Sequence, residues 1–247
     1  MCPAPMIPRV VISDTTPRAG GYSSHASRST PELPDTLARM ADPDSAHVPT
    51  SRPMDAWLDA LSQPNGSPGG GAATGVLLGV AAALMGMVAA YAPDSAAASA
   101  CAVRLERNRA DVLEAVEADG VLSARFGAAL ALPSDDPRRD AQVAAAAVEA
   151  AESVARLGAI GILLTSDARV LAEAGNPHIA VDLAVAMESL AAGLSGAAMS
   201  IRANLQIARR HDATPARPAS LEADVRRLLE ARRQVAQMID EISAQLD

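Results

Sequence analysis

Two carboxylates are the residues of this sequence whose types and positions could carry catalysis. Asp182 lies in the apolar stretch HIAVDLAVAM, where a buried carboxylate is costly unless it is paired or functional. Its neighbours within one helical turn offer no partner, so a catalytic role and a structural cap or inter-helix hydrogen bond both stay open. Asp119 follows Glu117 by two residues, and helical residues at that spacing diverge by about 200° and cannot form a pair on one face. A general acid or base, a helix kink before Gly120 and a solvated acid are all compatible with Asp119.

Polar and glycine residues elsewhere could contact a ligand. The run SPGGG opens a long uncharged stretch, and glycines at a helix start let an anionic or carbonyl group approach free N–H groups. Tight packing at an ordinary helix start is the alternative for this run. A Gly-Asn turn and two polar residues at i and i+4 on one apolar helix could bind a ligand or hydrogen-bond between helices. The substrate-binding candidates are Ser67, Gly69, Gly70, Gly71, Asn176, Ser200 and Asn204.

The composition excludes several classes of function. All 21 basic residues are arginine, so Schiff-base catalysis by lysine is impossible. A net charge of −8 argues against a nucleic-acid-binding protein, which usually presents a basic face. The two cysteines, Cys2 and Cys101, form no CxxC motif, and the four histidines are scattered. We therefore expect no metal site and no cofactor.

Helices must position the candidate residues. Alanine, the best helix former, is abundant, whereas aromatic residues make up only 2% of the chain. Helical periodicity and breakers predict an up-and-down bundle of about six or seven helices. The long apolar helices carry faces of small residues, and so short a chain cannot cover all of these faces itself. We therefore expect a second subunit to cover some of them in a homodimer. The expected helices span residues 54–63, 69–93, 100–133, 141–175, 178–210 and 221–246.

Residues 1–52 differ in character from the rest. They are rich in Pro, Ser and Thr and carry no secretory signal, so we predict a mostly disordered leader before a folded domain at 53–247. The uncharged stretch at 69–93 is long enough to span a membrane, but it is rich in Ala and Gly and lacks basic flanks. A buried core helix is the preferred interpretation, and we expect a cytoplasmic protein without membrane or nucleic-acid partners.

From about Met54 onward the sequence resembles the cyclodeaminase/cyclohydrolase family. This family includes the C-terminal domain of formiminotransferase-cyclodeaminase and the methenyltetrahydrofolate cyclohydrolases. The resemblance is carried by DAWLDALSQPNGSPGGGAATG before an Ala-rich helix that contains LMGMV, by Asp119 with Leu132-Pro133, and by Gly175-Asn176, Val181-Asp182 and SIRANL at 200–205. It covers roughly 190 residues, and its strength lies in the ordered set of motifs rather than in any one of them.

The resemblance implies an all-helical homodimer that acts on a tetrahydrofolate derivative as its substrate. Cyclodeaminases close 5-formiminotetrahydrofolate to the 5,10-methenyl form with loss of ammonia, and cyclohydrolases open the methenyl ring with water. Both reactions need proton transfer. By resemblance, Asp119 is the general acid/base, and Asp182 holds the pterin-like ring or stabilises a cationic amidinium. The glycine-rich turn and Asn204 would position the substrate.

Several positions depart from the family pattern. Ala72, Val181 and Ser200 stand where the family places Ser, Ser and Asn, and Ser123 replaces an aromatic residue. The basic residues that often follow the first long helix are also missing. Three hypotheses follow: a folate cyclohydrolase or cyclodeaminase, a diverged enzyme for a non-folate cyclic imine, amidine or other heterocycle of specialised metabolism, and a non-catalytic helical dimer. The sequence does not decide between water addition and ammonia loss.

Overall fold

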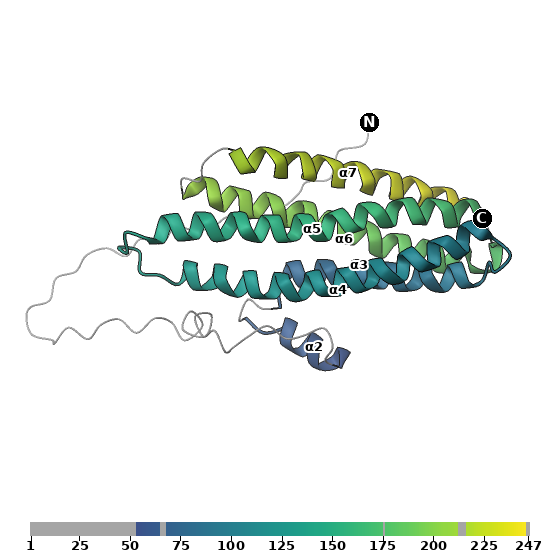
Figure 1. Ribbon diagram of the computed structural model, residues 1–247, viewed down its shortest axis with the longest axis horizontal. Helices are drawn as coiled ribbons and strands as arrows, with labels where there is room; N and C mark the ends of the chain where they lie inside the picture. The colour runs from purple at the N-terminus through teal and green to yellow at the C-terminus, as the bar shows by residue number, and fades with distance from the viewer. Residues whose placement is uncertain (1–52, 65–67, 175, 212–215, 246–247) are drawn as a thin grey trace, which may run out of the picture. The chain divides into compact units, whose positions relative to one another are not determined.

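The computed structural model describes residues 53–64, 68–174, 176–211 and 216–245. Within these ranges the chain forms six α-helices and one short 3-10 helix, without a strand, which confirms the predicted all-α fold. The long helices run up and down beside one another (Figure 1). The predicted leader at 1–52 and the candidate Ser67 lie outside the described residues.

The helices fall close to their predicted positions. A short helix is followed by five long ones, and the 3-10 helix directly precedes α6. They are α2 (Met54–Leu61), α3 (Gly70–Ala90), α4 (Ala96–Leu130), α5 (Arg139–Ala174), η1 (Pro177–Ile179), α6 (Ala180–Arg210) and α7 (Ala216–Ser243).

Two helix starts differ from the sequence prediction for local reasons. Helix α4 begins at Ala96, about one turn early, because the Ser95 side chain caps it by accepting a hydrogen bond from the Ala98 N–H (3.2 Å). Helix α7 begins at Ala216, inside the predicted linker HDATPARP. Pro218 is compatible with this start, because backbone N–H groups in the first turn of an α-helix have no acceptor within the helix, so a proline there loses no hydrogen bond.

Glycines bring the central helices into close contact. A Cβ atom added at Gly75 of α3 would lie 2.1 Å from a methyl group of Val116 on α4. A Cβ added at Gly193 of α6 would lie 2.5 Å from Leu78 of α3. Real Cβ atoms do not approach so closely, so a larger residue at either position would force its neighbour to shift, and α3 packs closely against both α4 and α6.

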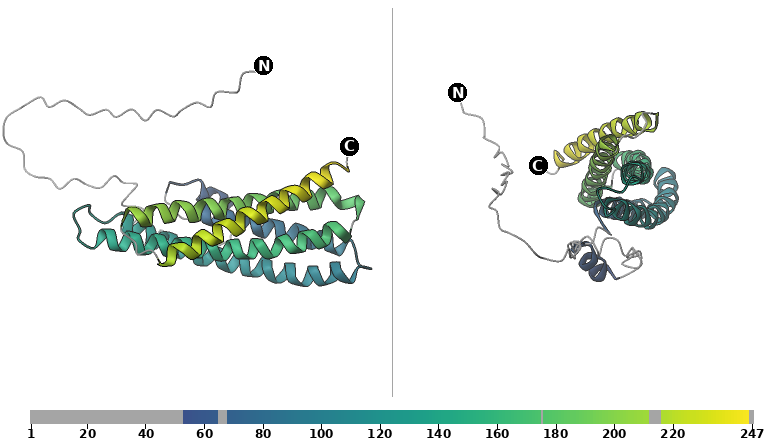
Figure 2. Two further views of the ribbon diagram at one scale, coloured as in Figure 1. Left: turned by 90° about the horizontal axis from the view of Figure 1, so that it is seen from above. Right: turned by 90° about the vertical axis from the view of Figure 1, so that its left-hand side faces the viewer.

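Helix α5 packs against α3, α4, α6 and α7. Viewed end-on, α4 and α7 lie on opposite sides of the bundle (Figure 2). Helices α3 and α6 are neighbours whose outer surfaces stay exposed. We call the exposed apolar residues there the α3–α6 outer face: Leu77, Met87, Tyr91, Val181, Val185 and Met199.

Helices α3 and α6 are also long and apolar enough to cross a membrane by length and composition. Half of the most apolar window of each helix is buried inside the bundle. Such burial is typical of a core helix in a helical bundle. The expectation of a core helix rather than a membrane span stays a prediction.

Candidate functional site

Asp119 lies in the interior of a continuous helix. Helix α4 passes through Asp119 and Gly120 without interruption, so this pair does not end the helix. The Asp119 residue is only 3% exposed, which also excludes a solvated surface acid. Because a buried carboxylate is costly, its retention at this place needs a specific reason.

The start of α3 approaches Asp119 directly. A Cβ atom added at Gly71 would lie 2.3 Å from Oδ2 of Asp119 and 3.2 Å from its Oδ1. Any larger residue at position 71 would therefore displace this carboxylate from its present position. The contact joins two sequence candidates, the glycine-rich turn and the acid, that are 48 residues apart in the chain. It places a buried carboxylate beside the N-terminal turn of an uncharged helix.

Helix α6 brings Ser200 and Asn204 toward the same end. A Cβ added at Gly196 would lie 2.5 Å from Oγ1 of Thr74, which fixes the level at which α6 passes α3. Because α6 runs antiparallel to α3, Ser200 lies one turn further on, about level with Gly70, and Asn204 a further turn of about 5.4 Å beyond. Both side chains are half-buried. The Gly71 end of the bundle therefore gathers most of the candidate residues.

Asn176 lies at the other end of the bundle. Its Nδ2 donates to the backbone oxygen of Tyr91 (3.1 Å), just after α3 ends, and its Oδ1 accepts from the His178 N–H (3.1 Å). These two bonds cap η1 and tie the start of α6 to the end of α3. The structure thus gives Asn176 a structural role, while its predicted contact with substrate stays a prediction.

Asp182 lies in the first turn of α6, near Asn176 rather than near Asp119. An acid in this position is stabilised by the partial positive charge of the helix N-terminus. The side chain is half-buried. At 1.5 Å per residue along α3, the levels of the two acids differ by about 20 Å. One chain therefore does not bring the two predicted catalytic carboxylates together.

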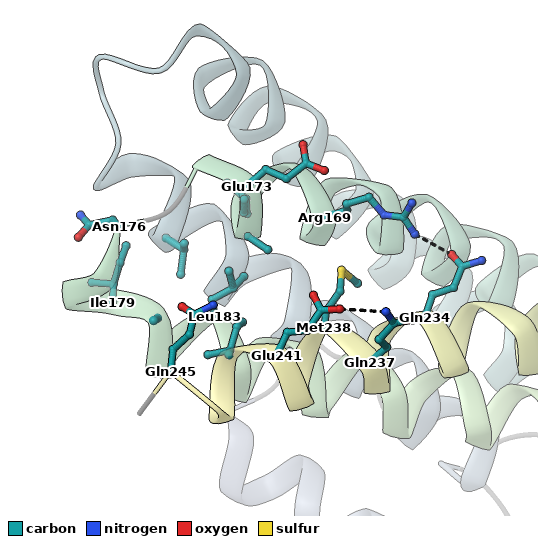
Figure 3. Close-up of a pocket in the computed structure, with 15 residues that line it drawn as sticks. Arg169, Glu173, Asn176, Ile179, Leu183, Gln234, Gln237, Met238, Glu241 and Gln245 are labelled. Atoms are coloured by element: carbon teal, nitrogen blue, oxygen red, sulfur yellow. Dashed lines mark hydrogen bonds between the residues drawn. The ribbon is translucent and has the colours of Figure 1, made fainter. Parts of the chain in front are cut away.

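A groove of about 480 Å³ opens beside Asn176, between α5, α6 and α7 (Figure 3). Its floor is apolar and includes Leu183 and Met238. Its polar rim is held by two hydrogen bonds, one from Arg169 to Gln234 (3.1 Å) and one from Gln237 to Glu241 (2.9 Å). Neither Asp119 nor Asp182 lines it, so the groove is separate from the acids.

Sequence reasoning missed a buried acid besides Asp119, namely Asp167 of α5, which is 3% exposed. Its Oδ1 accepts from Nε and an Nη of Arg104 (2.8 and 2.6 Å) and from Sγ of Cys101 (3.4 Å). The signal was available, because Asp167 stands in an apolar helix as Asp182 does. Its arginine partner, 63 residues away, could not be read from the sequence.

The environment of Cys101 holds its thiol protonated. Burial and then the hydrogen bond to Asp167 raise the pKa of Cys101 to about 11. Such a thiol is a poor nucleophile near neutral pH. Arg104 donates its own hydrogen bonds to Asp167, and these raise the pKa of Arg104 above its ordinary value. Within the described residues, no three His, Cys, Asp or Glu side chains gather in a way that could hold a metal ion.

Comparison with known proteins identifies the family of this chain. The family model described as formiminotransferase-cyclodeaminase matches residues 53–241, so the chain belongs to this family. Among solved structures, the chain is similar to the formiminotetrahydrofolate cyclodeaminase of Thermotoga maritima, with a TM-score of 0.62 and 18% sequence identity. That match covers 78% of this chain and 98% of the other. No curated protein matches this sequence.

Proposed function

We propose that this protein is a folate one-carbon enzyme that forms or hydrolyses 5,10-methenyltetrahydrofolate. The observation that carries the proposal is the buried Asp119 carboxylate held against Gly71 in a member of the formiminotransferase-cyclodeaminase family. A carboxylate fixed at a helix start, with polar side chains of α6 at the same level, can take up and return a proton next to a bound heterocycle.

The chemistry needs a single proton carrier. In the cyclodeaminase direction, N10 of 5-formiminotetrahydrofolate attacks the carbon of the protonated formimino group. Asp119 takes the N10 proton and returns it to the formimino nitrogen, which leaves as ammonia as its bond to carbon breaks. In the cyclohydrolase direction, Asp119 takes a proton from the attacking water. It then returns this proton to N5 as the N5–carbon bond breaks, and the hydroxyl of the addition intermediate releases its own proton to solvent as it becomes the formyl group on N10. With the formimino group protonated, the cyclodeaminase steps balance within the site, and the cyclohydrolase steps release one proton to solvent.

The test follows the ultraviolet absorbance of 5,10-methenyltetrahydrofolate with wild-type protein and with Asp119→Asn. Decay of the methenyl band that requires Asp119 identifies a cyclohydrolase. Its appearance from 5-formiminotetrahydrofolate identifies a cyclodeaminase. If the methenyl band changes with neither substrate, or if Asp119→Asn is as active as wild type, the proposal is wrong.

A second candidate is a diverged enzyme that acts on a non-folate cyclic imine or amidine. Three departures from the family pattern favour it, because they cluster around the proposed site. Ala72 follows Gly71, Ser123 lies one helical turn after Asp119, and Ser200 lies at the same level on α6. This candidate predicts that tetrahydrofolate derivatives neither bind nor react. A non-catalytic helical dimer would instead leave Asp119 and Asp182 without effect on any reaction or ligand affinity.

We also propose that the active unit is a homodimer joined through the α3–α6 outer face. Each of the six apolar residues that define this face is at least 38% exposed, and the exposed Glu188 lies among them on α6. Two helices about 30 Å long and 10 Å wide offer about 600 Å² per subunit, which gives a total at the lower end of specific interfaces. An antiparallel second copy would bring the partner's Asp182 end to the Asp119 end.

A mixing experiment tests this arrangement. Asp119→Asn and Asp182→Asn variants, each inactive alone, are unfolded together and refolded at equal concentration. A site shared between subunits restores one intact site in half of the dimers, so about a quarter of wild-type activity returns. If no activity returns, the site is not shared between subunits.

A second experiment tests the interface itself. Val185→Arg on the outer face should yield monomers in light scattering, whereas Val103→Arg, at a similarly exposed valine of α4, should not.

A further inference from the structure

Ser153 of α5 has a buried hydroxyl that makes no hydrogen bond. The residue is 1% exposed, and within the part of the chain that the structure describes its Oγ has no hydrogen-bond partner. A hydroxyl in a helix commonly donates to the carbonyl one turn back, as Thr165 of the same helix does to Gly161 (3.1 Å). Because an unpaired buried hydroxyl destabilises a fold and alanine would avoid this cost, the serine at position 153 needs another explanation.

Packing contacts show which residue of α5 lies level with the proposed catalytic carboxylate. A Cβ added at Gly75 of α3 would lie 2.1 Å from a methyl group of Val116 on α4 and 3.1 Å from a methyl group of Leu157 on α5, so these three positions converge. Helix α4 runs antiparallel to both α3 and α5. One turn from the three converging positions, toward the start of α3, the corresponding residues are Gly71, Asp119 and Ser153.

The side chains of Asp119 and Ser153 also point toward each other's helix. Asp119 follows Cys101 by 18 residues, or about five full turns, so both side chains leave α4 in the same direction. Cys101 contacts Asp167 of α5 in that direction (Sγ to Oδ1, 3.4 Å). On α5, the direction of Ser153 lies about midway between those of Leu157, which faces α3, and Asp167, which faces α4. The Ser153 hydroxyl is therefore directed between α3 and α4, where the Asp119 carboxylate lies.

We propose that Ser153 is a positioning residue for Asp119, an inference that rests on the proton transfer proposed above. In the structure the carboxylate lies against Gly71 and the Ser153 hydroxyl is unpaired. When the ionised carboxylate turns away from Gly71 toward α5, the hydroxyl donates a hydrogen bond to it. A group that takes a proton from one atom and returns it to another needs two positions, and Gly71 and Ser153 define them.

The test compares Ser153→Ala with Thr165→Val, which removes a buried hydroxyl of the same helix that does donate in the structure. Thermal unfolding and the steady-state kinetics of the methenyltetrahydrofolate reactions are measured for both variants and for wild type. Carbon-13 NMR of labelled aspartate carboxyl groups follows the titration of Asp119 in the protein without substrate. The Asp119 signal is assigned by its absence from the spectrum of Asp119→Asn.

We expect Ser153→Ala to unfold at a temperature no lower than wild type, because it loses a hydroxyl that is unpaired in the folded protein. Its kcat should fall by about ten-fold, the contribution of one hydrogen bond to a charged group, while its KM stays within about two-fold of wild type. The midpoint of the Asp119 titration should move to higher pH, because the ionised carboxylate loses a donor. Thr165→Val should show the opposite pattern: a lower melting temperature with unchanged kcat and titration.

Three results would overturn the positioning role. They are a kcat of Ser153→Ala equal to that of wild type, a loss of kcat accompanied by a lower melting temperature, and an unchanged Asp119 titration. The titration needs no substrate, so it decides the role of Ser153 even if wild type leaves the methenyl band unchanged. That last result would overturn the proposed reaction and not the contact between Ser153 and Asp119.

Discussion

Replacing Gly71 by alanine probes the contact between the start of α3 and the proposed catalytic carboxylate. The added Cβ would lie 2.3 Å from Oδ2 and 3.0 Å from Cγ of Asp119, whereas ordinary contacts begin near 3.4 Å. The Asp119 side chain must therefore retreat by about 1 Å. A displacement of that size at a reacting group lowers turnover by about 100-fold.

The effect of Gly71→Ala on stability should be small by comparison. Alanine in place of glycine in a helix stabilises it by about 1 kcal/mol. Overpacking at a buried contact costs about 1–3 kcal/mol. The net change in the free energy of unfolding is then between about zero and 2 kcal/mol of destabilisation. Activity and stability are thus expected to separate, because a folded protein would lose most of its turnover.

Gly86→Ala on the same helix is the matched control. A Cβ added at Gly86 meets no atom within 4 Å, so this variant gains the helical contribution without moving a neighbour. Initial rates on methenyl- and formiminotetrahydrofolate, together with thermal unfolding, are measured for both variants. If Gly71→Ala is folded and as active as Gly86→Ala, the position of the Asp119 carboxylate does not govern the reaction, and the reasoning fails.

Three further outcomes follow from the structure. Gly75→Ala forces a Cβ to within 2.1 Å of a methyl group in α4 and should lower the melting temperature by several degrees relative to Gly86→Ala. Asp167→Ala should lower the free energy of unfolding, measured in urea, by about 1–3 kcal/mol. This loss is smaller than for a fully buried ion pair, because the side chain of its partner Arg104 is 49% exposed. Because the folded pKa of Cys101 is raised from 9.0 to about 11, its contribution to the free energy of unfolding is full below pH 9. This contribution disappears as the pH rises through 11, which urea unfolding at a series of pH values measures. Alkylation of Cys101 near neutral pH should be slow, which peptide mapping measures.

Helix positions could be predicted from the sequence because local signals fix them. The uncharged stretch, the prolines and the apolar spacing placed the long helices to within a few residues. The starts of α4 and α7 differ from the prediction because the Ser95 side chain caps α4 and because a helix tolerates proline in its first turn. Both determinants are local and are present in the sequence.

The geometry of the site could not be predicted from the sequence, because it depends on contacts between distant segments. The approach of Gly71 to Asp119 follows from the packing of α3 on α4, which no spacing within either helix reveals. The separation of Asp182 from Asp119 follows from the antiparallel course of α3 and α6.

The distribution of the unusual residues bears on substrate choice. Ala72 is buried next to Gly71, Ser123 follows Asp119 by one turn, and Ser200 reaches the same level on α6, whereas Val181 lies at the far end beside Asp182. None of these changes alters a carboxylate. Loss of folate specificity would therefore raise the KM for tetrahydrofolate derivatives much more than it lowers kcat. A low kcat with an ordinary KM would instead place the defect at the carboxylates and not in the surrounding pocket.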